Sequence, residues 1–315
     1  MNKSEERNLI KVATLYYKEG LTQVEISKKM GVSRSLISKW LVAARNQGFI
    51  EFFFNSEEVY SVNLENQLEK KFGLKSATVI DTNNLSTSEI KKLLGQTAAL
   101  SIKNKIETVH SIGLSWGKSI QALVSQFPFE SYQNKVFIPL IGGMGTDNFE
   151  VHSNHLCYEF AKKTRSSSKY LYAPALINDP SAKKVLENNQ NIKEVLEEAK
   201  HVDMAIVSIS SPQHRNTMQD MGYITDKDIA ELLELNIVGD INSRFFDKQG
   251  KEVNHLSNTN VIGISIEDLK KIPQVIAIAY QKEKWSGIYY ACINHLITDL
   301  ITTDEIANEI LNAEL

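Results

Sequence analysis

The first fifty residues contain short amphipathic segments separated by glycines. The first segment has apolar residues at helical spacing: Leu9, Val12, Ala13 and Tyr16. This predicts a helix that stops at Gly20. Thr22 is a favourable N-cap for a second helix, and Glu25 three positions later completes a capping-box pattern. Gly31 ends that short helix at a tight turn.

A third helix is predicted from Ser33, its N-cap, to about Gln47, with Gly48 closing it. Its inner stripe is apolar: Leu36, Ile37, Trp40, Leu41 and Ala44. Its outward positions carry cations and small hydroxyls: Arg34, Ser35, Ser38, Lys39 and Arg45. Two helices joined by a short turn, with such residues on the second, are typical of a helix-turn-helix that reads the major groove.

The predicted DNA-binding residues divide by role. Ser35 and Ser38 are short enough for close approach to bases, and Arg34 can contact a guanine edge or a phosphate. Phosphate contacts are expected from the remaining positions, including the first turn of the second helix. The full predicted set is Thr22, Gln23, Ser33, Arg34, Ser35, Ser38, Lys39 and Arg45. The alternative is a three-helix packing module that binds no DNA.

Residues 49–54 alternate as a strand does, and could form a wing or begin the link to the rest of the chain. We therefore predict two domains, a helix-turn-helix domain over residues 1–54 and a larger domain over residues 55–315.

The larger domain begins with a predicted helix over residues 59–72 and then alternates strands with helices. Strands are predicted at 77–80, 109–113, 136–141, 170–173, 205–209, 261–264, 275–279 and 300–302. Helices are predicted at 88–106, 118–126, 153–163, 181–200, 226–235, 284–295 and 304–311. This alternation favours an α/β fold with a mainly parallel sheet covered by helices on both sides.

Composition narrows the class of protein. The 315 residues are 42% hydrophobic and 23% charged, which is typical of a globular protein of about two domains. The N-terminus lacks the apolar core of a signal peptide, and no apolar run is long enough to span a bilayer. Cys157 and Cys292 form neither a disulfide framework nor a metal-ligand spacing. We expect a cytoplasmic protein without a metal or a cofactor.

The charge is unevenly distributed. Residues 1–50 carry nine Lys and Arg against four Glu, whereas the whole chain has a net charge of −3. A basic head on an acidic body suits a polyanion-binding module joined to a domain that does not bind polyanions. The alternative is that these charges only solvate three helices.

Three loops of the larger domain are candidate ligand sites, because ligands of parallel sheets bind at the carboxyl ends of strands. The first, residues 113–119, leads from a strand into a helix. Its glycines, its Ser115 and Ser119 hydroxyls and Lys118 could hold a phosphate, although it is neither a P-loop nor a dinucleotide fingerprint. The alternative is a plain strand–helix turn.

The second loop, residues 142–145, precedes His152 and Asn154, whose alternative role is helix capping. In the third, residues 239–247, Asp240 could accept hydrogen bonds from sugar hydroxyls, while Asp247 with Gly250 indicates a turn. Lys284 could add a cation at the sheet edge, unless it is a solvated helix lysine.

These motifs occur together in one order along the chain: TQVEISKKMGVSRSLISKWL (22–41), GLSWGKS (113–119), PLIGGMG (139–145), HSN (152–154), VGDINSRFFDKQG (238–250) and ITTDEIA (301–307). In this order they resemble the SorC/DeoR family of bacterial sugar-binding transcriptional regulators. The resemblance implies an N-terminal all-α (winged) helix-turn-helix domain and a C-terminal Rossmann-like α/β effector domain similar to sugar-phosphate isomerases. It also implies operator DNA, a sugar-phosphate effector and a homodimer or homotetramer, with no membrane partner.

By this resemblance the 113–119 loop and Lys284 would hold phosphate, and Asp240 would face the sugar. The predicted effector-binding set is Gly113, Ser115, Trp116, Gly117, Lys118, Gly142, Gly143, His152, Asn154, Asp240 and Lys284. The chain departs from many members in lacking two glycines shortly before Lys284. Its EKWSGI (283–288) and QLEKKFGLKSATV (67–79) segments resemble the sorbose-operon regulator branch, which implies L-sorbose or its 1-phosphate.

Ile141 leaves the second loop without a lysine that could form a Schiff base, so reversible noncovalent binding is expected. Two other functions remain open. The chain could be a sugar-phosphate isomerase or aldolase-like enzyme with a DNA-binding head, although neither Asp240 nor His152 has an evident acid/base partner. Alternatively, the larger domain could serve only for oligomerisation.

Overall fold

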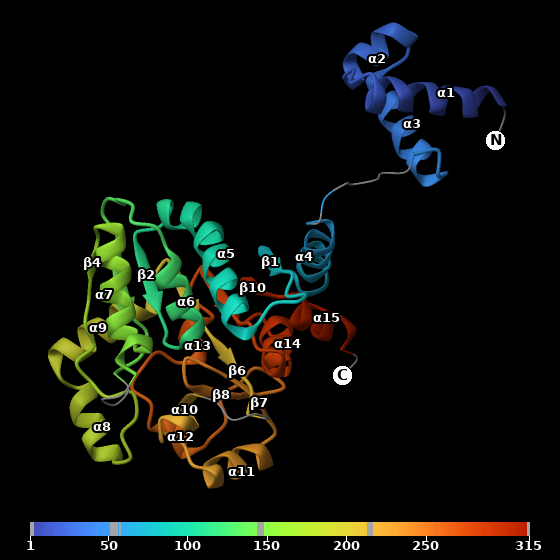
Figure 1. Ribbon diagram of the computed structural model, residues 1–315. Coiled ribbons are helices and arrows are strands. Elements are labelled where there is room, and N and C mark those ends of the chain that lie inside the picture. Colours follow the sequence, from blue (N-terminus) through green and yellow to red (C-terminus); the bar gives the residue numbers. More distant parts are fainter. Residues whose placement is uncertain (1–2, 51–55, 57, 144–147, 213–216, 314–315) are drawn as a thin grey trace. The chain divides into compact units, whose positions relative to one another are not determined.

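The computed structural model describes residues 3–50, 56, 58–143, 148–212 and 217–313, and the chain divides into two compact units, residues 1–59 and 60–315 (Figure 1). The predicted strand at 49–54 and the predicted boundary at 54/55 fall almost wholly on residues outside these described ranges. None of the helices in the described part of the chain combines the length and apolar character that crossing a membrane requires.

The first unit is a helix-turn-helix. α1 (Lys3–Ala13) continues through the π-helical turn η1 (Thr14–Lys18), and α2 (Gln23–Met30) and α3 (Arg34–Asn46) follow. Thr22 caps α2 in a capping box with Glu25, and Ser33 caps α3. The small core comes from all three helices and the turn: Val12, Leu15, Ile26, Ile37 and Leu41. These helices and caps confirm the predicted arrangement.

The second unit is built on a seven-stranded sheet in which every neighbouring pair is parallel. In spatial order the strands are β1 (Ser76–Ile80), β10 (Asp299–Thr303), β9 (Gln274–Ile278), β5 (Met204–Val207), β2 (Ser111–Leu114), β3 (Val136–Pro139) and β4 (Ser167–Ser168). The parallel α/β architecture agrees with the predicted fold class.

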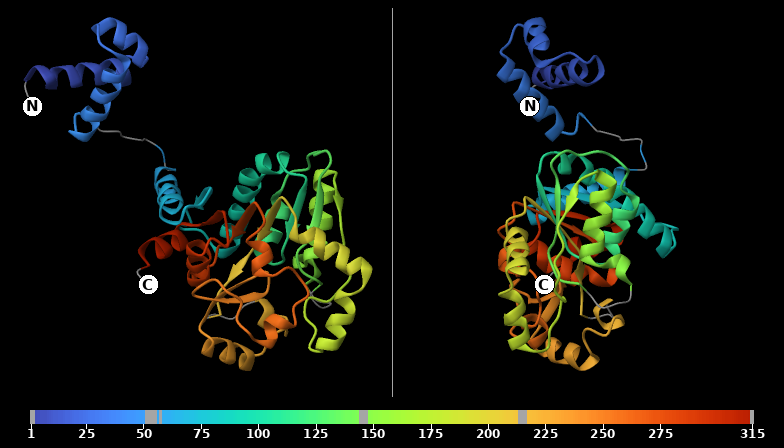
Figure 2. Two further views of the ribbon diagram at one scale, coloured as in Figure 1. Left: turned by 180° about the vertical axis from the view of Figure 1, so that it is seen from behind. Right: turned by 90° about the vertical axis from the view of Figure 1, so that its left-hand side faces the viewer.

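Helices cover both faces of this sheet. One face carries α5 (Thr87–Glu107), α6 (Lys118–Gln126) and α7 (Ser153–Thr164). The other carries α4 (Val59–Phe72), α9 (Gln190–Lys200), α13 (Ile266–Leu269), α14 (Trp285–Ile293) and α15 (Asp304–Asn312). The side view in Figure 2 shows α7 and α9 on opposite sides of the sheet. Because both faces are covered, β5 is a continuous apolar run rather than an alternating one.

Helix α4 also protects the sheet edge. The outward amides of Ala77 and Val79 in β1 donate to the carboxylates of Glu69 (2.9 Å) and Glu65 (2.8 Å). These charge-assisted bonds satisfy backbone groups that an edge strand would otherwise expose.

A smaller lobe lies beyond one end of the main sheet (Figure 1). It contains the antiparallel sheet β6 (Ile209–Ser210), β7 (Ile237–Ile241) and β8 (Arg244–Asp247), with α10 (Thr217–Asp220), α11 (Asp226–Glu234) and α12 (Leu256–Thr259). The remaining elements are η2 (Phe149–Val151), α8 (Pro180–Glu187) and η3 (Lys282–Lys284).

Several predicted elements of the second unit are wrong. Residues 170–173 form no strand, because the Asn154 amide pairs with both the N–H and the C=O of Leu171 in place of a neighbouring strand. Residues 261–264 make only isolated bridges. The predicted helix 181–200 is two helices, since Asn189 caps α9. The segment taken as a loop at 239–247 is largely the β7–β8 hairpin.

Candidate functional site

A cavity of about 380 Å³ opens at the carboxyl ends of the neighbouring strands β9, β5 and β2. The order in which the chain adds strands to the sheet reverses here: β3 and β4 follow β2 on one side, whereas β5, the next strand of the chain, lies on the other side of β2. Ligands of open parallel sheets bind at such reversals. The described residues that line the cavity are Trp116, Gly117, Lys118, Ser119, Ser208, Ser210, Ser211, Thr217, Met218, Asp220, Asp240, Asn242, Ser243, Gln281, Glu283 and Lys284.

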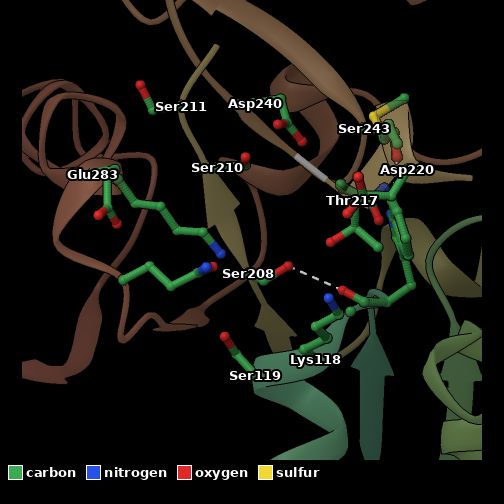
Figure 3. A pocket seen from close by; sticks show the side chains of 16 residues that line it. Lys118, Ser119, Ser208, Ser210, Ser211, Thr217, Asp220, Asp240, Ser243 and Glu283 are labelled. Carbon is green, nitrogen blue, oxygen red and sulfur yellow. Dashed lines mark hydrogen bonds between the residues drawn. The ribbon is translucent and has the colours of Figure 1, made fainter. Parts of the chain in front are cut away.

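One end of the cavity is the N-terminus of α6. Gly117 is its N-cap at φ 120°, and no side chain caps the first-turn amides. A Cβ at Gly117 would lie 3.2 Å from the Ser208 hydroxyl, which donates to the Trp116 carbonyl at 3.0 Å (Figure 3). The Ser119 hydroxyl is buried without a hydrogen-bond partner among the described residues. Free amides, a helix dipole and a spare hydroxyl together suit an anion.

Two ammonium groups converge on the same cavity, those of Lys118 and Lys284. Enclosure by the protein lowers the pKa of Lys284 to about 8; Asp240 opposes this shift, while the like charge of Lys118 adds to it. An anion between the two lysines would relieve their repulsion and favour the charged form of both.

Carboxylates lie across the cavity from α6. Burial raises the pKa of Asp240 in β7 to about 6, although Lys284, the Ser243 amide and the Ser210 side chain all favour its ionised form. Figure 3 shows Asp240 and Ser210 on the side of the cavity opposite Lys118 and Ser119. With Asp220 and Glu283, the described wall carries three acids and two lysines. The cavity thus presents an anion-binding end and an acceptor-rich end.

Five of the predicted effector residues line the cavity: Trp116, Gly117, Lys118, Asp240 and Lys284. The other six are not among the described lining residues: Gly113, Ser115, Gly142, Gly143, His152 and Asn154. Gly113 lies inside β2, where a Cβ would be 2.4 Å from Leu140. A Cβ at Gly142 would be 2.5 Å from the Ala173 carbonyl, so its role is close backbone packing.

The remaining four residues are also engaged within the fold, each in a different way. The Ser115 side chain is fully buried, and His152 is the N-cap residue of α7. The Gly143 amide donates to the Ala173 carbonyl at 2.8 Å. The side-chain amide of Asn154 is hydrogen-bonded to the backbone N–H and C=O of Leu171. None of these six residues lines the cavity in the described structure, so their predicted effector contacts stay predictions without support from the cavity geometry.

The sequence prediction missed much of the wall, including Ser208, Ser210, Ser211, Thr217 and Asn242. Ser208 follows β5 directly, but the predicted strand runs to residue 209, so the rule that places candidates after strands did not reach it. Thr217 and Asn242 gave no such signal, because α10 and the β7–β8 hairpin were not predicted.

In the helix-turn-helix unit, the outer face of α3 presents exposed Arg34, Ser35, Lys39 and Arg45, with Ser38 partly buried. Gln23 at the start of α2 lines a shallow hollow together with Arg34. The hydroxyls of Thr22 and Ser33 accept hydrogen bonds from the first turns of α2 and α3, so both have a capping role besides any DNA contact. The distribution suits base contacts from the start of α3.

One side-chain group in the described ranges has the composition of a metal site: Asp228, Glu231 and His255. The Nδ1 of His255 accepts the Ser257 amide at 3.1 Å, so in the neutral ring the proton is on Nε2, which lies 3.2 Å from Glu231. A protonated Nε2 cannot ligate a metal, and Asp228 is engaged in the capping box of α11.

Known proteins resemble the chain over its whole length. A family model described as "Putative sugar-binding domain" matches residues 57–312. The sorbitol operon regulator of Klebsiella pneumoniae is 31% identical over 312 residues, covering 98% of this chain and 99% of that protein. Its full-length crystal structure, SorC, aligns with a TM-score of 0.77 over 99% of this chain and 100% of that chain.

Two further relatives agree. The deoxyribonucleoside regulator of Bacillus subtilis is 24% identical over 312 residues, covering 99% of each protein. The structure of a DeoR family transcriptional regulator from Listeria monocytogenes is 44% identical, with a TM-score of 0.75 over 79% of this chain and 99% of that chain.

The chain has a helix-turn-helix unit followed by an α/β unit that the sugar-binding family model matches, and its relatives are named as regulators, which places it in the class of transcriptional regulators with a sugar-binding domain. The chain belongs to the SorC/DeoR family of sugar-binding transcriptional regulators, as its motifs predicted.

Proposed function

We propose that this regulator controls a carbohydrate-utilisation operon and that a phosphorylated sugar, bound in the cavity of the second unit, changes its affinity for double-stranded operator DNA. The observation that carries the proposal is the N-terminus of α6, where, among the described residues, no side chain caps the first-turn amides and the buried Ser119 hydroxyl has no partner, and where Lys118 and Lys284 line the same cavity. A phosphate would accept hydrogen bonds from the first-turn amides and Ser119 and would pair with Lys118 and Lys284.

The opposite end of the cavity suits a polyol. The Asp240 carboxylate accepts hydrogen bonds, and the Ser210, Ser211 and Thr217 hydroxyls can both donate and accept. A cavity of about 380 Å³ is near the lower end of the range for small-molecule sites, about 300–1,000 Å³. A monosaccharide phosphate has the required combination of small size, an anionic end and hydroxyls.

The sorbitol operon regulator is a full-length relative, and two segments of the chain resemble the sorbose-operon branch, so we propose a hexose or hexitol as effector, with L-sorbose 1-phosphate first and free L-sorbose second. Contact with DNA is assigned to the α3 residues Arg34, Ser35, Ser38, Lys39 and Arg45, with Gln23 at a phosphate. A homodimer or homotetramer in the cytoplasm would place two heads on one operator.

The test is a thermal-shift screen of the full chain with L-sorbose, L-sorbose 1-phosphate, D-fructose 1-phosphate and inorganic phosphate. A ligand at one hundred times its Kd stabilises the native state by about 2.7 kcal/mol, which raises the Tm by several degrees. A positive compound should also change operator affinity in fluorescence anisotropy. If no sugar or sugar phosphate alters either quantity, the unit serves oligomerisation alone; if the compound is converted, the chain is an enzyme.

A further inference from the structure

The turn of the β7–β8 hairpin has unusual backbone geometry. Asn242 and Ser243 form a two-residue loop between Ile241 and Arg244, and both have positive φ, 53° and 60°. Such turns favour glycine at the second position, because a side chain is disfavoured in the left-handed region. A serine at this position accepts backbone strain that glycine would avoid, so the contacts of its hydroxyl are worth following.

Ser243 connects two parts of the cavity wall. Its hydroxyl, which is fully buried, accepts a hydrogen bond from the Trp116 indole Nε1–H at 2.9 Å. Its backbone amide favours the ionised form of the Asp240 carboxyl and so opposes the rise in the pKa of that group. Ser243 therefore bonds the aromatic side chain that immediately precedes the α6 N-cap and also acts on the acceptor at the polyol end.

The same contact determines what Trp116 offers a ligand. The indole has a single N–H donor, and Ser243 occupies it. The Trp116 side chain therefore has no free donor for a ligand, and any part of its ring that lines the cavity is apolar, which suits the carbon-bound hydrogens of a sugar rather than its hydroxyls.

We propose that Ser243 is a positioning residue of the effector site, which holds the Trp116 ring against the carbon skeleton of a sugar while Asp240 accepts its hydroxyls. This inference rests on the function proposed above. It predicts that the Ser243 hydroxyl contributes to recognition of the sugar and contributes nothing to recognition of the phosphate.

The principal variant is Ser243→Gly, which removes the hydroxyl, keeps the amide that Asp240 needs and suits the positive φ, so the fold is retained. Asn236→Gly is the matched control: Asn236 is an exposed residue with φ 57° just before β7, outside the cavity wall. Calorimetric titration of the full chain uses L-sorbose 1-phosphate, D-fructose 1-phosphate and inorganic phosphate as probes.

Ser243→Gly should weaken sugar-phosphate binding about three- to tenfold, the range for one neutral hydrogen bond, and leave the Kd of inorganic phosphate within twofold. Asn236→Gly should leave both unchanged. In a Trp116→Phe background, where no indole N–H remains, Ser243→Gly should cost less than twofold. The Trp116 indole N–H resonance, assigned by its loss in Trp116→Phe, should shift in Ser243→Gly and not in Asn236→Gly.

Three results would overturn the inference. An unchanged sugar-phosphate Kd in Ser243→Gly, with the indole resonance shifted, means that the contact has no role in binding. Equal weakening of sugar phosphate and inorganic phosphate means that Ser243 acts on general structure. Failure of the wild-type chain to bind any sugar phosphate overturns the proposed function and this inference together, and is recognised because the wild type itself fails.

Discussion

Replacing Asp240 with Asn should make the effector-free protein more stable at neutral pH. The pKa of this buried carboxyl is raised from 3.8 to about 6, so protonation stabilises the native state below pH 3.8 and this stabilisation is lost as the pH rises to about 6. That difference corresponds to about 3 kcal/mol of unfolding free energy at neutral pH. Asn has the same shape, can still accept the Ser243 amide and carries no charge.

The net gain is smaller than this value. One carboxylate oxygen becomes an NH₂ donor in the variant, so an acceptor is lost for the groups that favour the Asp240 anion, Ser243 and Ser210. We expect Asp240→Asn to raise the free energy of unfolding by about 1–2 kcal/mol at pH 7, and the Tm by a few degrees. The same variant should weaken binding of a sugar phosphate, because an acceptor for hydroxyls is lost.

The assay is urea unfolding of both proteins by circular dichroism between pH 4 and pH 8, without effector. The stability difference should be near zero at pH 4, grow through pH 6 and then level off. Asp299→Asn is the control of opposite sign: Asp299 is buried, and its bonds to Lys105, Ser76 and Thr298 lower its pKa. Loss of that partnered charge should cost about 3–5 kcal/mol at pH 7. An Asp240→Asn protein less stable than wild type at pH 7, or a difference independent of pH, would refute the reasoning.

Three further outcomes are expected. Arg34→Ala should reduce the preference for operator over random DNA by about 1–3 kcal/mol in competition anisotropy, whereas equal loss on both DNAs would make Arg34 a phosphate contact. Lys284→Met should weaken sugar-phosphate binding at least tenfold in calorimetry while effector-free operator binding persists; Lys282→Met, on the same turn but paired with Glu309, is its control. Gly117→Ala should weaken inorganic phosphate binding, because φ 120° disfavours a side chain and the added Cβ presses on Ser208; an unchanged Kd would count against the α6 site.

The sequence predicted best those features that depend on local chemistry. The capping box of Thr22 and Glu25, the Ser33 cap and the left-handed Gly31 all occur as expected, because each depends on residues within a few positions of one another. The strand–helix alternation likewise indicated the parallel sheet, since strands buried on both faces are apolar throughout.

Features that depend on distant partners were not predictable in this way. Residues 170–173 have strand-like composition, yet the Asn154 side chain takes the place of a partner strand. The sequence predicts a loop at 239–247, because Asn242 and Ser243 are not the usual glycine-containing hairpin signal. Asp240 is a candidate because its carboxylate follows a predicted strand-like segment, whereas the role of Ser243 depends on its contact with the distant Trp116.

The distribution of polar groups whose charged forms are poorly stabilised supports the proposal that the cavity, rather than another polar cluster of the described structure, binds the effector. At the amino ends of the strands, Asp203 receives the amides of His110 and Ser111, and Asp299 has four partners, so these charges already stabilise the ligand-free fold. At the carboxyl ends, the pKa values of Asp240 and Lys284 are shifted toward their neutral forms and the start of α6 has no cap. A ligand that supplies an anion and hydroxyls there can make hydrogen bonds and ion pairs that these groups lack in the ligand-free protein. Under the proposed function, the same groups lower the stability of the empty protein and provide its affinity for the effector.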